Sequence, residues 1–358
     1  MTGVGGHARA DDSTDVRTRV FVATGNRIAV IDSRTNQSVD TLDVGLTPRL
    51  LALTPFSSPS PPVLAAADGR SGTLVLLDPG RKTQSRLTLT FPIRRIALSG
   101  DGTVLAASDL EGGHVALVRL ADRHPLAAPP ELGPVSDFLF VGDDATLAIA
   151  GERGTGLHDP RTGAWTPINV PPANLGRAPV LARSANGRRL FLRSADGGPV
   201  AIAETPGGRL LAPLPARPGA GLVTPSATGA YLLLTDERRH AMTIVHGDDL
   251  TPGADLPGAT GMGRPYSGWF DSVAFVPTAD SRLLIYDLWR LSVAGEIALP
   301  SPPGPGAVTA DGSRLYLPLG ADRSVAVIDT RTRRMVGRIV FDAPTEAVIV
   351  GGAYGLCH

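Results

Sequence analysis

The sequence contains little cysteine, few aromatic residues and no long apolar run, and each shortage excludes a class of protein. Cys357 is the only cysteine among 358 residues, which excludes an internal disulfide and any site built from several cysteines. No run of 18 or more apolar residues exists, so we expect no membrane-spanning helix. The 34 Lys and Arg residues balance the 34 Asp and Glu residues, so the chain lacks a net field that would attract nucleic acid.

Glycine, proline and apolar residues are plentiful instead. A hydrophobic fraction of 42% is enough to build a core, and 42 Gly with 32 Pro predict frequent turns. Residues 1–18 read as a flexible N-terminal segment. We expect a cytoplasmic protein. The alternative is an exported one whose signal peptide is missing from this chain, because Ala8-Arg9-Ala10 resembles the end of a signal peptide without its apolar stretch.

An internal repeat decides the fold prediction. Eight apolar runs follow turn residues at intervals of 41 to 44 residues, a spacing too regular for chance. These runs begin at Arg19, Val63, Val104, Thr146, Arg189, Tyr231, Val273 and Arg314.

Each unit holds further strands. In the last unit the strands read RLYLPLG, SVAVIDTRT and RMVGRIVF, and a fourth strand such as RRIALSGDG (94–102) leads into the next run through an Asp-Gly turn. Four antiparallel strands per repeat are typical of a propeller blade. We therefore predict an all-β fold, a single closed β-propeller over residues 19–358 with eight four-stranded blades.

Seven blades are the alternative, because the fourth unit has only the weak strand GTGLHDP. The chain starts on a second strand and ends on an innermost-type strand, PTEAVIV (344–350). The N- and C-terminal strands are therefore predicted to share one blade, which closes the ring and removes a free sheet edge.

The segments DGSRLYLPLGADRSVAVIDTRTRRMVGRI (311–339) and VFVATGNRIAVIDSRTNQSV (20–39) resemble the repeat of the YVTN-type propellers. That superfamily includes lactonases, haem-binding relatives of nitrite reductases, amine-dehydrogenase heavy chains and surface-layer adhesins. The resemblance therefore implies a fold and leaves the function open. No catalytic motif of those relatives is found here beyond the repeat itself.

In a propeller the starts of the innermost strands surround the mouth of the axial channel. Aligned units place three arginines, Arg49, Arg94 and Arg264, and one carboxylate, Glu346, at this position. Arginine forks match carboxylate and phosphate geometry, so this ring predicts a site for an anionic ligand. The alternative is that these residues are solvated strand ends with acidic partners of their own.

The seventh unit differs from the others, with GMGRPYSGWFDS (261–272) where its siblings carry an apolar strand. Tyr266, Trp269 and Phe270 could cover a ligand or pack in the core. We expect Trp269 to bind the ligand and Tyr266 to take part in catalysis through its hydroxyl.

The loop DERRH (236–240) is predicted to lie beside this strand. It brings Asp236 and Glu237 near His240, and a His beside carboxylates has the composition of an acid–base pair. His240 and Glu346 are accordingly the candidate catalytic groups, with Asp236 and Glu237 as ligand-binding residues. Ordinary surface roles are the alternative.

Other constellations are absent or weak. Cys357 and His358 are too few to make a metal site, so we predict no metal. The sequence has no P-loop, GxSxG elbow or CxxCH haem-attachment motif, and it identifies no cofactor.

Two function classes follow. The first is a small-molecule-binding or catalytic propeller with an anionic or carbonyl-bearing ligand at the channel mouth, using lyase, lactonase or cyclase type acid–base chemistry if it is an enzyme. The second is a scaffold that binds a protein partner, or a cofactor-holding subunit of a bacterial redox complex. The same arginine and aromatic residues are favoured in protein interfaces, so they predict both.

Overall fold

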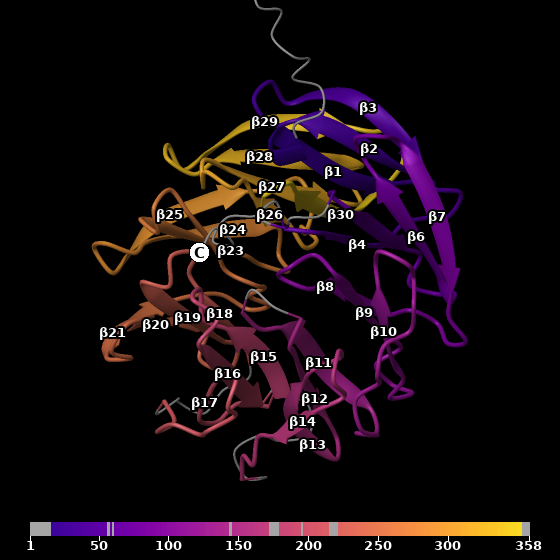
Figure 1. Cartoon of the computed structure of the whole chain (residues 1–358). Helices are drawn as coiled ribbons and strands as arrows, with labels where there is room; N and C mark the ends of the chain where they lie inside the picture. The colour runs from indigo at the N-terminus through magenta and orange to yellow at the C-terminus, as the bar shows by residue number, and fades with distance from the viewer. Residues whose placement is uncertain are drawn as a thin grey trace, which may run out of the picture.

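The chain forms a ring of eight antiparallel sheets in a computed structural model (Figure 1). The structure describes residues 16–55, 58, 61–142, 145–171, 179–194, 196–214 and 221–352. A short 3-10 helix, η2 (Val16–Thr18), precedes the first strand. Residues 1–15 of the predicted N-terminal segment, and Cys357 with His358, lie outside the described residues.

We number the blades from the N-terminus and give the strands of each from the ring centre outward. Blades 1 to 4 are β30 (Thr345–Val350), β1 (Arg19–Thr24), β2 (Arg27–Asp32), β3 (Gln37–Asp43); β4 (Leu50–Leu53), β5 (Leu64–Ala67), β6 (Thr73–Asp78), β7 (Thr83–Thr88); β8 (Arg95–Leu98), β9 (Val104–Ser108), β10 (Val115–Arg119); and β11 (Val135–Phe140), β12 (Leu147–Gly151), β13 (Gly154–His158), β14 (Trp165–Pro167).

Blades 5 to 8 follow the same order. They are β15 (Pro179–Arg183), β16 (Arg189–Ser194), β17 (Ala201–Glu204); β18 (Val223–Pro225), β19 (Tyr231–Asp236), β20 (Ala241–His246), β21 (Pro252–Pro257); β22 (Tyr266–Gly268), β23 (Val273–Pro277), β24 (Arg282–Asp287), β25 (Ser292–Ala298); and β26 (Ala307–Val308), β27 (Arg314–Leu319), β28 (Ser324–Asp329), β29 (Arg334–Val340).

The eight-bladed ring is confirmed, and the doubtful fourth unit forms a complete four-stranded sheet. Blades 3 and 5 differ in detail from the predicted pattern. Their outer strand is reduced, within the described residues, to isolated bridges such as Val118 with Pro125 and Val200 with Leu214.

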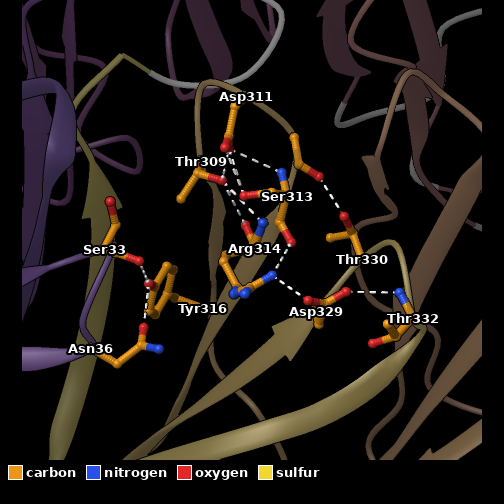
Figure 2. Close-up of polar contacts among 11 residues, drawn as sticks. Ser33, Asn36, Thr309, Asp311, Ser313, Arg314, Tyr316, Asp329, Thr330 and Thr332 are labelled. Carbon is orange, nitrogen blue, oxygen red and sulfur yellow. Dashed lines mark hydrogen bonds and ion pairs between the residues drawn. The ribbon is translucent and has the colours of Figure 1, made fainter.

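The two ends of the described chain close the ring as predicted. Strand β1 pairs antiparallel with β30, with Phe21 opposite Ile349. The hydroxyl of Tyr316 in blade 8 donates to Asn36 Oδ1 in blade 1 at 2.7 Å, a contact drawn in Figure 2. First and last segments are thus joined by backbone and side-chain hydrogen bonds, which close the ring.

The apolar runs are continuous because the middle strands are covered on both sides by neighbouring blades. All six residues of β1 are buried. Val20 and Val22 pack in one cluster with Tyr316 of blade 8, while Phe21 packs in the next with Leu64 of blade 2. The core is therefore a set of clusters between blades.

Two faces of the ring matter for function. The loop face carries the loops between blades and the turns between second and third strands. Gly258 N, in such a loop, donates to His240 O in such a turn at 2.7 Å. The turn face carries the turns between first and second and between third and fourth strands. Leu288 N donates to Ser272 O across two of these turns at 3.0 Å.

Candidate functional site

The candidate site is a cavity of about 420 Å³ on the ring axis. Its walls are residues of the innermost strands of blades 3 to 6 together with Arg264, which precedes β22. A smaller cavity of about 200 Å³ adjoins it and shares Thr224, Pro225 and Arg264 with it. We refer to the two neighbouring cavities together as the axial hollow.

Asp137 is the buried acidic group of this hollow. A β-bulge at Ser136 interrupts the alternation of β11, so that Val135 pairs with Gly151 and Asp137 with Ala150. Only 4% of Asp137 is exposed. Its carboxylate accepts hydrogen bonds from Phe138 N and from Leu181 N, both at 2.8 Å.

Arg95 is the ionic partner of Asp137. Its Nη1 lies 2.6 Å from Asp137 Oδ1. The guanidinium also lies over the ring of Phe138, with Cζ 5.3 Å from the ring centroid. Blade 3 and blade 4 are therefore joined inside the cavity by an ion pair that orients both side chains.

Burial dominates the protonation of Asp137. It raises the pKa of this carboxyl, and the charge of Arg95, the two amide donors and the more distant Arg264 lower it only in part. A raised pKa on a carboxyl that lines a cavity is characteristic of functional acids.

Arg264 extends into the cavity from the opposite wall. The backbone before it is held by the bond from Gly263 N to Pro277 O at 2.8 Å. Its side chain is exposed and makes no hydrogen bond or ion pair to any other described residue. Among the described residues that line the larger cavity, Arg95, Arg183 and Arg264 oppose the single carboxylate of Asp137. The hollow is thus net positive.

Arg49, Arg94 and Glu346 lie on the loop face and do not line the axial cavity. Arg49 Nη2 is 3.8 Å from Glu346 Oε1, so two of the predicted residues face each other. Arg94 Nη1 donates to Gly69 O at 2.6 Å. These contacts correspond to the alternative in which strand-end charges have local partners.

The DERRH turn lies on the loop face but points away from the axis. Asp236 is buried and accepts a hydrogen bond from Arg239 N at 2.9 Å, and it lines a separate cavity of about 560 Å³ between blades 5 and 6. Glu237 and His240 are exposed, and His240 Nδ1 is 3.4 Å from Thr260 Oγ1. The structure therefore does not bring these residues together with Arg264.

Tyr266 lines the smaller cavity beside Arg264, so these two predicted residues do meet. Its hydroxyl accepts a hydrogen bond from Gly306 N at 2.8 Å, and burial raises the pKa of this phenol. Trp269 follows β22 and lies on the turn face, at the other end of the strand from Arg264. It does not line the described axial cavity.

The sequence interpretation missed Arg95 and Asp137. Arg95 follows the predicted Arg94, and only the inward or outward alternation of β8 separates their roles. A signal for Asp137 existed, namely a single acidic residue in the mainly apolar VSDFLF. Its inward orientation depends on the bulge, which periodicity does not show.

The described residues that line the hollow include no His, Met or Cys, the usual protein ligands of haem iron. Over the described part of the chain no three His, Cys, Asp or Glu residues gather as a metal site.

No helix in the described part of the chain is long and apolar enough to cross a membrane.

No protein-family model matches the sequence, and a search of curated proteins gave no match. Solved structures do match. The dihydro-heme d1 dehydrogenase NirN in complex with DHE aligns with a TM-score of 0.75 at 17% identity, over 98% of this chain and 78% of that chain. Apo AztD from Citrobacter koseri aligns with a TM-score of 0.67 at 13% identity, over 94% and 98%.

The C-terminal WD40 domain of Sif2 aligns with a TM-score of 0.62 at 14% identity, over 80% of this chain and 82% of that one. The chain has a β-propeller fold. At these identities the likeness shows the fold alone, and the YVTN-type assignment within the propellers stays a prediction.

Proposed function

We propose that this propeller binds a small organic anion in its axial cavity, with Arg264 and Arg95 as the groups that recognise it. The observation that carries the proposal is Arg264, a cavity-lining guanidinium without a hydrogen-bond or ion-pair partner among the described residues. A cation left in this way retains its full set of donors for a ligand.

Charge supports an anion over a neutral ligand. The described cavity walls carry three arginines against one carboxylate, and a concave site with low-dielectric walls strengthens their field. A guanidinium binds a carboxylate through two parallel hydrogen bonds, which fixes the orientation of the ligand as well as its charge. A carbonyl-bearing carboxylate would satisfy the same donors.

Size supports a small molecule. The larger cavity of about 420 Å³ falls within the range of small-molecule sites, and the adjoining one extends it. NirN, which is similar in fold, is described in complex with the ligand DHE. That likeness supports a binding role for a propeller of this kind and leaves the ligand of this chain to be identified.

A reaction in this cavity would use Asp137 as its acid or base. Asp137 is the carboxyl of the described walls, and burial raises its pKa toward the range in which a proton can be given and taken. We therefore propose Asp137 for the role that the sequence suggested for His240, Glu346 or Tyr266, in lyase, hydrolase or cyclase type chemistry.

The test is a calorimetric titration with citrate, succinate and inorganic phosphate as probes. Arg264→Gln removes the proposed anchor, and Arg94→Gln is its matched control because Arg94 lies outside the cavity. We expect at least one probe to bind the wild type, with affinity reduced about tenfold or more in Arg264→Gln and unchanged in Arg94→Gln. No binding of any probe, or equal binding by all three proteins, would overturn the proposal.

A further inference from the structure

The turn between the first and second strands of blade 7 departs from its siblings. In blades 3, 5, 6 and 8 this turn has a hydroxyl residue first, a small residue second and glycine fourth, and the glycine N donates to the first carbonyl. These turns are Ser99–Gly102, Ser184–Gly187, Ser226–Gly229 and Thr309–Gly312. Strand pairing places Gly268–Asp271 of blade 7 at the equivalent positions, and here the turn bond is shifted by one residue and runs from Ser272 N to Trp269 O at 3.1 Å.

The turn of blade 7 lacks features that stabilise the same turn in other blades. In blade 8, Thr309 Oγ1 accepts a hydrogen bond from Arg314 N at 3.0 Å, as Figure 2 shows, whereas blade 7 has Gly268 at this position, which has no side chain to accept such a bond. Trp269, Phe270 and Asp271 have φ values of 40°, 55° and 51°, which are unfavourable for residues with a Cβ.

The strained turn is held by its neighbours. Asp271 is buried and its carboxylate accepts a hydrogen bond from Thr228 N of blade 6 at 2.9 Å. On the other side, Trp269 N donates to Gly312 O of blade 8 at 2.9 Å. Strain that is maintained from both sides points to a function for the side chains that the turn displays.

Those side chains form an aromatic patch, which we define as half-buried Trp269 with exposed Phe270 and Trp289. Phe270 is 67% exposed, and Trp289, in the adjoining turn of the same blade, is 68% exposed. The bond from Leu288 N to Ser272 O joins the two turns, and Arg331 of blade 8 lies 5.1 Å from the Trp269 ring. In other blades the position of Trp289 is filled by residues such as Arg34, Arg161 and Arg331.

Exposed apolar side chains concentrate around this patch. Every large hydrophobic residue of the described chain that is exposed belongs to blade 7, 8 or 1. The others lie on outer strands and are Val39, Val293, Met335, Val336 and Val340. Among the described residues of this kind, Phe270 and Trp289 are those that lie in turns of the turn face, and exposed aromatic side chains of this size are a feature of interaction surfaces.

Charges of opposite sign lie on the two sides of the patch. The turn of blade 6 on the same face carries exposed Asp248 and Asp249. On the other side, the corresponding outer turn of blade 8 presents exposed Arg331, while exposed Asp311 lies in the inner turn of blade 8 and exposed Arg290 follows Trp289 in blade 7. Within the patch, Asp271 is buried and Asp287 pairs with Arg333 at 2.9 Å, so neither neutralises these outer charges.

From this order of acid, aromatic and base we infer that the turn face binds a second copy of this chain. A two-fold axis lying in the plane of that face along blade 7 sets each patch against its copy. The same rotation places blade 6 of one chain opposite blade 8 of the other. Asp248 and Asp249 of each chain therefore face Arg331 of the other chain. A contact between two copies about a two-fold axis requires a surface that is complementary to itself, whereas binding of an unrelated partner does not require this.

The first test is the mass of the purified chain by sedimentation velocity over a wide concentration series. We expect a reversible dimer, with the dissociation constant raised about tenfold or more in Phe270→Ala/Trp289→Ala. Val336→Ser/Val340→Ser is the control on the outer edge of blade 8 and should leave the dimer intact. A monomer at every concentration, or a dimer lost only in the edge variant, would overturn the inference.

The second test is a charge exchange. Asp248→Arg/Asp249→Arg places like charges across the axis, and so does Arg331→Asp, so each variant alone should be monomeric. Mixed together, the two variants form only complementary pairs and should give a heterodimer. Dimers of each variant alone, or failure of the mixture to associate while the wild type dimerises, would show that the contact lies elsewhere.

Discussion

The guanidinium of Arg95 and the carboxylate of Asp137 meet at 2.6 Å in the axial cavity, one from blade 3 and the other from blade 4. Asp137 is almost fully buried, whereas the Arg95 side chain is 40% exposed and faces the hollow. The pair thus places one acid and one cation where a bound molecule would touch both.

Arg95→Ala should destabilise the fold. The variant leaves a buried carboxylate with two amide donors and no cation, and the loss of one partner of a buried pair is costly. Because Arg95 is partly exposed we expect about 1–3 kcal/mol from urea unfolding. Arg94→Ala, one residue earlier, should change stability by less than about 0.5 kcal/mol. Equal effects in both variants would contradict the assigned orientation of β8.

Asp137→Asn should strengthen anion binding at neutral pH. The change removes the negative charge of the described cavity walls and keeps one of the two oxygen acceptors, so that one of the bonds from Phe138 N to Oδ1 and from Leu181 N to Oδ2 is retained. We expect an affinity gain of about three- to tenfold for the probes above, measured by calorimetry. Weaker binding would mean that the carboxylate itself contacts the ligand as an acceptor.

Anion binding by the wild type should strengthen as pH falls. Burial raises the folded-state pKa of Asp137 above 3.8, so the carboxyl takes up its proton at a higher pH in the folded chain than in the unfolded one. Neutralisation of Asp137 makes the cavity more positive. Titrations at several pH values should show this gain, and Asp137→Asn should lack it.

Acid stability should depend on Asp32 at the closing blade. Burial opposes its ionisation, but hydrogen bonds from Arg34 and Arg19 and the charge of Arg34 outweigh burial and hold its pKa at about 2. A depressed pKa contributes stability that is complete above about 4 and is lost as pH falls toward 2. Thermal unfolding of Asp32→Asn should therefore be less pH-dependent than wild type across this window. Parallel curves would refute the assignment.

Phe270→Gly should stabilise the protein. Phe270 has φ 55° and is 67% exposed, so glycine relieves backbone strain and little burial is lost. We expect a gain of about 0.5–1 kcal/mol. Ala310→Gly, in the corresponding turn of blade 8, should destabilise by a similar amount because Ala310 is free of this strain. A loss of stability in Phe270→Gly would indicate that the ring packs against its neighbours.

The architecture follows from the sequence because one physical pattern repeats eight times. Each predicted apolar run forms the second strand of a blade, and β30 pairs with β1 as the closing strand should. Middle strands buried on both sides must be apolar throughout, so their spacing reports the blade spacing directly. The outer strands of blades 3 and 5 do not follow this pattern, because exposed strands need not be apolar.

Individual site residues are harder to predict, for reasons that are local. The loop-face alignment points to the region of Arg264, which lines the axial cavity, but the choice between Arg94 and Arg95 depends on strand alternation. The inward position of Asp137 depends on a bulge at Ser136. Trp269 lies on the turn face because β22 has only three residues and the chain has already reached that face.

The most direct test of the account is a crystal structure of the protein soaked with the tightest-binding of the three probe anions. We predict density for the anion in the axial cavity, within hydrogen-bonding distance of the Arg264 guanidinium and next to the Arg95–Asp137 pair. An anion bound instead at Arg49 or Arg94 on the loop face, with no anion in the axial cavity, would contradict it.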